Sequence, residues 1–310
     1  MTSINTVFDL FGLHSWQTFK SAQQEIVLPA GSAAHIPVTI RYIDVGEADK
    51  GTVLLMHGIP TWGFLYHAII PPLVEAGYRV LAPDFLGHGW SDRRDRFDRS
   101  FQSQARMIVA FFSSLRLENV DVVGHDTGGA VALILAIEHS HLVNRLVITN
   151  SVCYDRFDDD MLDFGHPLRW KSRSVAELVN ALEESLAAGL SNLKQLTSEF
   201  SEGIIAPWNS EEGKLSLLRN ASALNANQTM ALVDRHGTIS APTLVLWAMD
   251  DPWQKSEDGL QLASEIPPAR FQAIEGASHW VQQDAPQQFL DALLSFLESA
   301  SHNSVVETRS

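Results

Sequence analysis

Cysteine, positive charge and long hydrophobic runs are all scarce in this sequence. The single cysteine, Cys153, excludes a disulfide within the chain and fits a reducing compartment. Lys and Arg number 22 against 37 Asp and Glu, which gives a net charge of −15 and argues against nucleic acid or an anionic membrane as a partner. A small, neutral or weakly charged molecule is therefore the expected ligand, and the oligomeric state stays open.

Signals for export and for membrane insertion are also missing. No run reaches the roughly 18 apolar residues that a membrane span requires. Residues 1–16 show neither the basic start nor the apolar stretch of a signal peptide. We therefore expect a cytoplasmic protein without a membrane partner.

Short apolar runs rich in β-branched residues alternate with longer stretches of helical periodicity, a pattern typical of parallel βαβ units. The candidate strands are residues 25–30, 38–46, 52–58, 78–85, 120–125, 145–152, 242–249 and 270–276. The candidate helices are residues 64–77, 100–115, 129–140 and 286–300. This alternation predicts an α/β fold in which helices flank an eight-stranded, mostly parallel sheet.

The alternation stops after Val152, the end of the sixth candidate strand. Residues 153–225 are more polar and include a helix-like run at 174–190, so we interpret them as a helical cap inserted over the sheet. The predicted organisation is a core at 1–152, the cap at 153–225, the second part of the core at 226–300 and a frayed tail at 301–310.

The stretch VVGHDTGGAV at 122–131 leads from an apolar run through a tight turn into a predicted helix. Its G-x-D-x-G spacing is that of a nucleophile elbow, in which a sharp turn lifts one side chain above the sheet edge. Gly124 and Gly128 supply the small residues that such a crowded turn requires, and Asp126 is the residue it lifts. The alternative is that Asp126 merely caps the following helix.

Further polar residues follow other predicted strands. The segment LLMHGIP ends one strand in a turn that can aim the backbone N–H of Ile59 toward the elbow, Asp250 and Asp251 end another, and His279 follows the last. The carboxyl ends of parallel strands meet at one edge, where ligands bind. A lone histidine after a strand is usually structural, but the order nucleophile, acid, histidine favours a catalytic set.

These motifs resemble those of the α/β-hydrolase superfamily, specifically its branch with an aspartate nucleophile, the haloalkane dehalogenases and epoxide hydrolases. GHDTGG is similar to the family's GHDWGG elbow, and SHWVQQDAP to its histidine segment. HGIPTWGFLYHAIIPPLVEAGYRVLAPDFLGHGWSD looks like the stretch from the oxyanion turn to the fourth core strand. The resemblance covers most of residues 20–152 and 235–298 and implies this family's fold.

The resemblance also implies a role for each site residue. Asp126 would be the nucleophile, His279 the base that activates water, and Asp251 the acid, since the family acid sits three residues after the position of Ala248. The backbone N–H groups of Ile59 and Thr127 would form the oxyanion hole. A carboxylate that displaces a leaving group from saturated carbon gives an ester that water can cleave, whereas serine would give an inert ether. No metal or cofactor is needed.

The sequence differs from the family pattern at the two positions whose side chains bind the leaving halide. The family's Trp after the nucleophile and Asn after His-Gly correspond to Thr127 and Ile59. We therefore expect a leaving-group donor from the cap, and Trp170 is favoured by its distance beyond the nucleophile. Each cap aromatic can equally well pack the cap onto the core. The candidates are Trp170, Trp208, His166 and Tyr154.

The sequence thus predicts a hydrolase that forms a covalent alkyl ester on Asp126 and acts, like a haloalkane dehalogenase, on a small to medium neutral substrate. An epoxide hydrolase is the first alternative. A ligand-binding protein with little turnover on the same scaffold, or an ester or lactone hydrolase, are the others.

Overall fold

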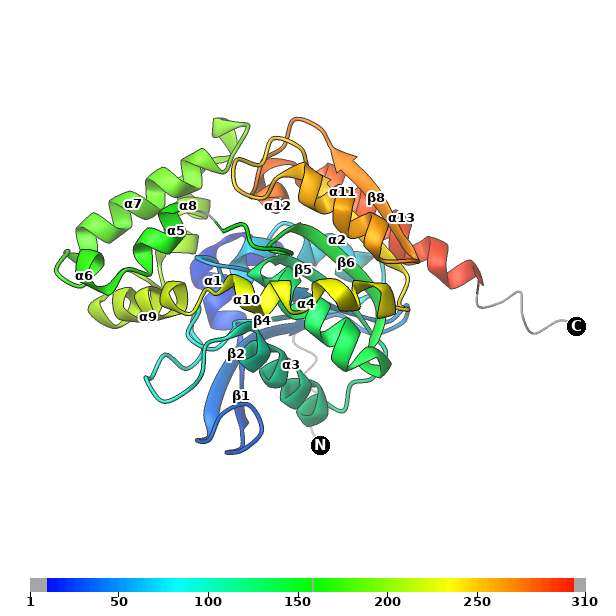
Figure 1. Ribbon diagram of the computed structural model, residues 1–310, viewed down its shortest axis with the longest axis horizontal. Helices are drawn as coiled ribbons and strands as arrows, with labels where there is room; N and C mark the ends of the chain where they lie inside the picture. The colour runs from blue at the N-terminus through cyan, green and yellow to red at the C-terminus, as the bar shows by residue number, and fades with distance from the viewer. Residues whose placement is uncertain (1–9, 158, 304–310) are drawn as a thin grey trace, which may run out of the picture.

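One eight-stranded sheet, with the order β1-β2-β4-β3-β5-β6-β7-β8, forms the centre of the computed structural model, which describes residues 10–157 and 159–303 (Figure 1). β1 (Gln24–Leu28) and β2 (Val38–Val45) run antiparallel to their neighbours. The other strands are parallel to one another, which confirms the predicted mostly parallel sheet. They are β3 (Thr52–Met56), β4 (Arg79–Pro83), β5 (Val120–Asp126), β6 (Val143–Ser151), β7 (Thr243–Ala248) and β8 (Ala269–Ile274).

Helices cover both faces of the sheet, so its central strands are apolar on both sides. In β3, Val53 and Leu55 join one hydrophobic cluster while Leu54 joins the other, because successive side chains of a strand point to opposite faces. The first face is covered by α1 (Trp16–Ala22), α2 (Ile70–Glu75) and α13 (Pro286–Asn303). The second is covered by α3 (Phe101–Leu115), α4 (Thr127–Glu138) and α11 (Ser256–Glu265).

The helix predicted over 64–77 is interrupted. The chain instead forms a 3-10 turn, η2 (Gly63–Tyr66), and then α2, in which Pro71 lies in the first turn. Proline lacks an N–H and its ring clashes with the preceding turn, so it is tolerated only where a helix begins. Other short elements of the core are η1 (Leu10–His14), η3 (Ser140–Leu142), α10 (Ala226–Met230), η5 (Val233–Thr238) and α12 (Val281–Asp284).

The segment between β6 and β7 carries the cap, the green to yellow-green lobe at the left of Figure 1. The predicted run at 174–190 is α7, which begins at a capping box formed by Ser174 and Glu177. The cap elements are α5 (Asp159–Phe164), α6 (Pro167–Trp170), α7 (Val175–Ala188), η4 (Leu193–Gln195), α8 (Ser198–Ile205) and α9 (Glu211–Ser222).

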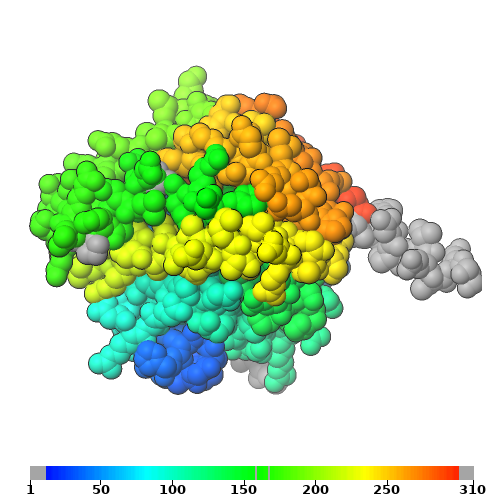
Figure 2. Space-filling model, in the orientation of Figure 1, coloured from blue at the N-terminus to red at the C-terminus, as the bar shows by residue number. Residues whose placement is uncertain are grey.

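The cap is seated directly on the core. Figure 2 shows its green and yellow-green segments in contact with the orange C-terminal and cyan N-terminal parts of the chain. The two ends of the insertion are joined, because the hydroxyl of Thr229 donates to the carbonyl of Tyr154. Of the predicted tail, 301–303 continue α13 and 304–310 lie outside the described residues. Among the helices that the structure describes, none has both the length and the apolar character to cross a membrane.

Candidate active site

Asp126 lies at the sharp turn between β5 and α4, at the carboxyl end of the strand. Its φ of 53° lies in a region that side chains rarely adopt. A Cβ on Gly128 would lie 2.4 Å from the carbonyl oxygen of His57, and one on Gly124 would lie 2.6 Å from that of Gly128. Both glycines are therefore required by close backbone approach, as in a nucleophile elbow.

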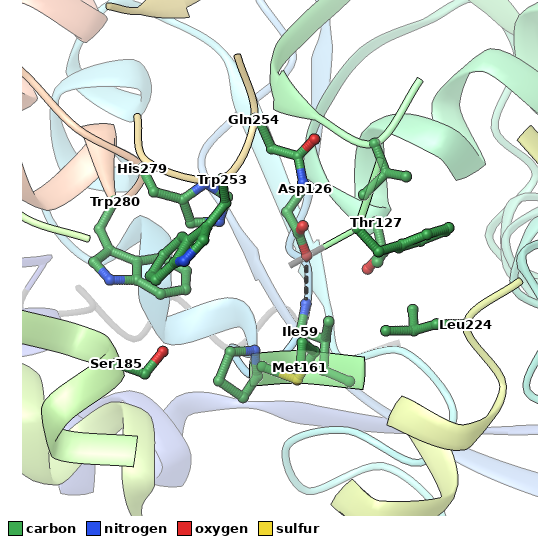
Figure 3. A pocket seen from close by; sticks show the side chains of 13 residues that line it. Ile59, Asp126, Thr127, Met161, Ser185, Leu224, Trp253, Gln254, His279 and Trp280 are labelled. Carbon is green, nitrogen blue, oxygen red and sulfur yellow. Dashed lines mark hydrogen bonds between the residues drawn. The ribbon is translucent and has the colours of Figure 1, made fainter. Parts of the chain in front are cut away.

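The Asp126 side chain does not cap α4. It makes no capping hydrogen bond, and its Oδ1 instead accepts the backbone N–H of Ile59 at 2.8 Å (Figure 3). Burial raises the pKa of Asp126 to about 6, although nearby His279 and the N–H groups of Thr127 and Ile59 favour the charged form. The carboxylate is thus mostly ionised at neutral pH yet poorly hydrated, which suits a nucleophile.

Buried His57 fixes the turn that presents Ile59. Its Nε2 accepts the N–H of Phe85 at 3.0 Å, so its Nδ1 carries the proton and donates to the Gly58 carbonyl at 2.8 Å. Burial lowers the pKa of His57 to about 4, so the ring is neutral at physiological pH. Its role is to hold the backbone of the oxyanion turn.

Asp251 follows β7 and orients His279, since its Oδ2 lies 2.8 Å from His279 Nδ1 and both side chains are buried. Its Oδ1 accepts the backbone N–H groups of Trp253 at 2.8 Å and Gln254 at 3.0 Å. Burial alone would raise the pKa of Asp251, but His279 and these donors outweigh it and hold the pKa below its usual range. The pairing selects the Nδ1–H tautomer of His279, which leaves Nε2 unprotonated and able to accept a proton. Asp250 is exposed.

Asn150, at the end of β6, holds the same carboxylate and was not predicted. Its Nδ2 donates to Asp251 Oδ2 at 2.8 Å and to the Ala248 carbonyl at 3.1 Å, while its Oδ1 accepts the Ala248 N–H at 3.0 Å. Its φ of 40° lies in a region for which asparagine is better suited than most residues. The signal in the sequence is a polar residue within the apolar run RLVITNSV.

His125 contacts His279 from β5, the strand that ends at Asp126. Its Nε2 donates to the backbone carbonyl of His279 at 2.9 Å, and the two ring centroids are 4.7 Å apart. Burial lowers the pKa of His125 to about 3, so this ring is also neutral. Within residues 10–157 and 159–303, no three His, Cys, Asp or Glu side chains are grouped as a metal ion would require.

Asp126 and His279 open into one pocket between the core and the cap, with about 370 Å³ of space between its lining atoms (Figure 3). The oxyanion turn supplies one wall, and the lining is mostly apolar. The lining residues are Ile59, Pro60, Asp126, Thr127, Val152, Phe157, Met161, Ser185, Leu224, Trp253, Gln254, His279 and Trp280.

The two cap tryptophans expected to reach the leaving group do not line this pocket. Trp208 is fully buried, and its indole N–H donates to the Pro60 carbonyl at 2.6 Å. The indole N–H of Trp170 donates to Asp163 Oδ2 within the cap at 3.1 Å. Both donors are therefore occupied by the protein itself, and these positions argue against the favoured Trp170.

The other two cap candidates are also outside the pocket. The hydroxyl of Tyr154 donates to Glu265 Oε2 on α11 at 2.8 Å, and His166 is exposed. Two tryptophans that sequence reasoning missed lie there instead. Trp253 and Trp280 flank His279, with ring centroids 4.9 and 4.4 Å from its own. The signals are a Trp directly after the histidine and another two residues after Asp251.

Comparison with known proteins places these features in a family. A family model described as alpha/beta hydrolase fold matches residues 51–286. A haloalkane dehalogenase of Mycolicibacterium paratuberculosis is 28% identical over 273 residues, covering 85% of this chain and 89% of the relative. A cis-3-alkyl-4-alkyloxetan-2-one decarboxylase of Xanthomonas campestris pv. campestris is 24% identical over 285 residues, covering 84% and 93%.

The fold is also similar to that of solved structures. An alpha/beta hydrolase fold protein from Burkholderia ambifaria superposes with a TM-score of 0.78 at 23% identity, covering 83% of this chain and 94% of its own. Because the family model spans most of the sequence and the eight-stranded, mostly parallel sheet with flanking helices agrees with it, the chain belongs to the alpha/beta hydrolase fold family.

Proposed function

We propose that the protein is a hydrolase that displaces a halide from a saturated carbon through an alkyl ester on Asp126. The observation that carries this proposal is a carboxylate at the apex of the elbow, held on the Ile59 N–H in one pocket with His279. The similarity to a relative named haloalkane dehalogenase supports it. The mostly apolar lining supports a small to medium neutral substrate.

In the first step Asp126 attacks the carbon that bears the halogen. A carboxylate oxygen forms the new C–O bond while the carbon–halogen bond breaks, and the halide leaves with the bonding electrons. Burial keeps the carboxylate weakly hydrated, so little water has to be removed before attack.

In the second step His279 takes a proton from water, which attacks the carboxyl carbon of the Asp126 ester. Negative charge develops on the carbonyl oxygen, where the N–H groups of Ile59 and Thr127 stabilise it. Asp251 stabilises the protonated imidazole. Collapse breaks the bond between the carboxyl carbon and the alkyl oxygen, the leaving alkoxide takes the proton from His279 to become the alcohol, and Asp126 retains one oxygen atom that came from water.

Epoxide opening is less well supported by this pocket. The ring oxygen must gain a proton as it opens, and the aspartate-nucleophile hydrolases that open epoxides resemble this chain but use tyrosines of the cap. None of the four tyrosines lines the pocket, and Tyr154 is bonded to Glu265. A halide leaves as an anion and needs no proton.

The test is one turnover in water enriched in oxygen-18, followed by mass spectrometry of the peptide that contains Asp126. The substrates to be tried are haloalkanes, epoxides and cis-3-alkyl-4-alkyloxetan-2-ones. Halide release is measured for the haloalkanes and diol formation for the epoxides. We expect halide release and heavy oxygen in the Asp126 side chain. Label in the product alone would contradict the ester, and ligand-induced stabilisation without product would support a binding protein instead.

A further inference from the structure

Gln254 brings a polar side chain to the pocket. The residue is 3% exposed and lines the pocket together with Asp126 and His279. Within the part of the chain that the structure describes, its hydrogen bonds involve its backbone only. The carboxamide atoms are not among the fully buried side-chain atoms without a partner, so they face the pocket space, where a bound molecule can form hydrogen bonds with them.

The backbone of Gln254 is fixed at both its polar groups. Its N–H donates to Asp251 Oδ1 at 3.0 Å, and its carbonyl accepts the indole N–H of Trp247 at 3.0 Å. The same Asp251 carboxylate orients His279, so the backbone that carries the carboxamide is held in a fixed position relative to His279. Figure 3 shows the Gln254 side chain pointing into the pocket, on the side where Asp126 lies.

We propose that the Gln254 carboxamide is the hydrogen-bond donor to the departing halide. This inference rests on the proposed function. Charge develops on the halogen as its bond to carbon breaks, and an amide N–H stabilises that charge without transferring a proton. In the similar dehalogenases a Trp directly after the nucleophile supplies this donor, and here that position is Thr127, which has no indole N–H.

Trp280 is a weaker candidate for this role, although its indole N–H is buried and has no partner in the described residues. A Cβ on Gly189 would lie 2.3 Å from that nitrogen, so the N–H faces the end of α7 rather than the reacting carbon. Ser185 of α7 also lines the pocket, but none of its hydrogen bonds in the described residues reaches Asp251. Trp253 and Gln254 both line the pocket and both donate their backbone N–H to Asp251 Oδ1, and Gln254 is the more buried of the two.

The experiment compares single-turnover alkylation by chloro-, bromo- and iodoalkanes of the same chain length in the parent and in Gln254→Met. Methionine keeps the length of the side chain and removes the donor. We expect a loss of about tenfold or more with the chloroalkane, the size of one transition-state donor. The loss should be smaller with bromide and smallest with iodide, because better leaving groups need less stabilisation.

Equal losses across the three halogens would indicate a packing defect and overturn the proposal, as would unchanged rates. If Gln254→Met does not fold, Gln254→Asn carries the test, since it draws the amide back by one methylene and should give the same halogen order. The matched control is Gln261→Met on α11, an exposed glutamine bonded to Glu265, which should keep all three rates.

The two proposals fail in different ways. If the parent never forms an ester on Asp126, the proposed function fails. If the ester forms and Gln254→Met forms it at the parental rate with every halogen, the proposed function stands and only the assignment of Gln254 fails.

Discussion

The two walls of the pocket use their polar groups in different ways. On the core wall, the carboxylate of Asp251 bonds to His279, to Asn150 and to two backbone N–H groups, and Asp126 sits on the N–H of Ile59. On the cap wall, the surface turned to the pocket is mostly apolar. The cap tryptophans Trp170 and Trp208 lie outside the pocket, and their indole N–H groups bond to the protein. The cap side chains in the lining are Phe157, Met161, Ser185 and Leu224. The core therefore holds the charged side chains in place by hydrogen bonds, whereas the cap determines the shape of the pocket through its apolar side chains.

Removal of the base from the core wall should have the largest effect. His279→Gln leaves Asp126 able to attack carbon but removes the group that activates water, so we expect hydrolysis to fall by about a hundredfold to ten-thousandfold. The alkyl ester should accumulate, and intact-protein mass spectrometry after mixing with substrate measures it. Turnover at the parental rate would remove His279 from this role.

Loss of the bond between Asn150 and the acid should have the next largest effect. Asn150→Leu removes a donor to a buried carboxylate, a bond worth about 1.5–3 kcal/mol, so we expect hydrolysis to slow by about tenfold to a hundredfold. Alkylation should change less, because Asp251 acts through His279. The control is Asn144→Leu at the other end of β6, where Asn144 bonds to Asp121 at 2.7 Å far from the pocket. Equal slowing in both variants would contradict the assignment.

The pH dependence of alkylation tests the burial of Asp126. Because burial raises its pKa to about 6, Asp126 keeps its proton at a higher pH than an exposed carboxyl does, and the protonated form cannot attack. We expect a constant rate above neutral pH and a fall approaching about tenfold per unit below pH 6. Rapid-quench kinetics in the parent measures this fall. In His279→Gln, which removes a group that favours the charged form of Asp126, the fall should begin at a higher pH, whereas a fall caused by titration of His279 should disappear. A rate that stays constant down to pH 5 would contradict the raised pKa.

The smallest effects on chemistry should come from the cap. Trp208→Phe leaves the Pro60 carbonyl without its partner, so we expect a loss of about 1–3 kcal/mol in the free energy of unfolding and little change in alkylation. Trp170→Phe should cost less stability and also leave alkylation intact. Chemical denaturation and single-turnover kinetics measure the two quantities. A tenfold slowing of alkylation in Trp170→Phe would support Trp170 as the leaving-group donor, as predicted from the sequence. It would also show that the cap contributes to the chemistry.

The parts of the fold that could be predicted are those set by local rules. Strand periodicity located the sheet, and the spacing of Gly124 and Gly128 located the elbow, because a side chain at either position would strike backbone atoms. The helix over 64–77 was predicted too long because its apolar pattern hides the break at Pro71. In the cap, α8 is short and α9 is polar, so only α7 showed a clear helical pattern.

The residues of the candidate site can also be divided into those that local sequence patterns predict and those that they do not. Turn motifs placed Asp126, Asp251 and His279 at strand ends, and the structure brings Asp126 and His279 to one pocket, with Asp251 bonded to His279. Asn150 was not predicted, because its bond to Asp251 joins residues 101 positions apart and no local pattern announces it. The partner of the Trp208 indole lies 148 positions away, so its occupation by the protein could not be predicted either.

The hydrogen bond between Thr229 and Tyr154 closes the cap into a loop whose two ends lie side by side. Every cap side chain of the lining lies between these two residues, namely Phe157, Met161, Ser185 and Leu224. Replacement of residues 155–228 between these anchor points by a segment of another length would therefore change the whole cap side of the pocket and leave Asp126, Asp251 and His279 in the sequence.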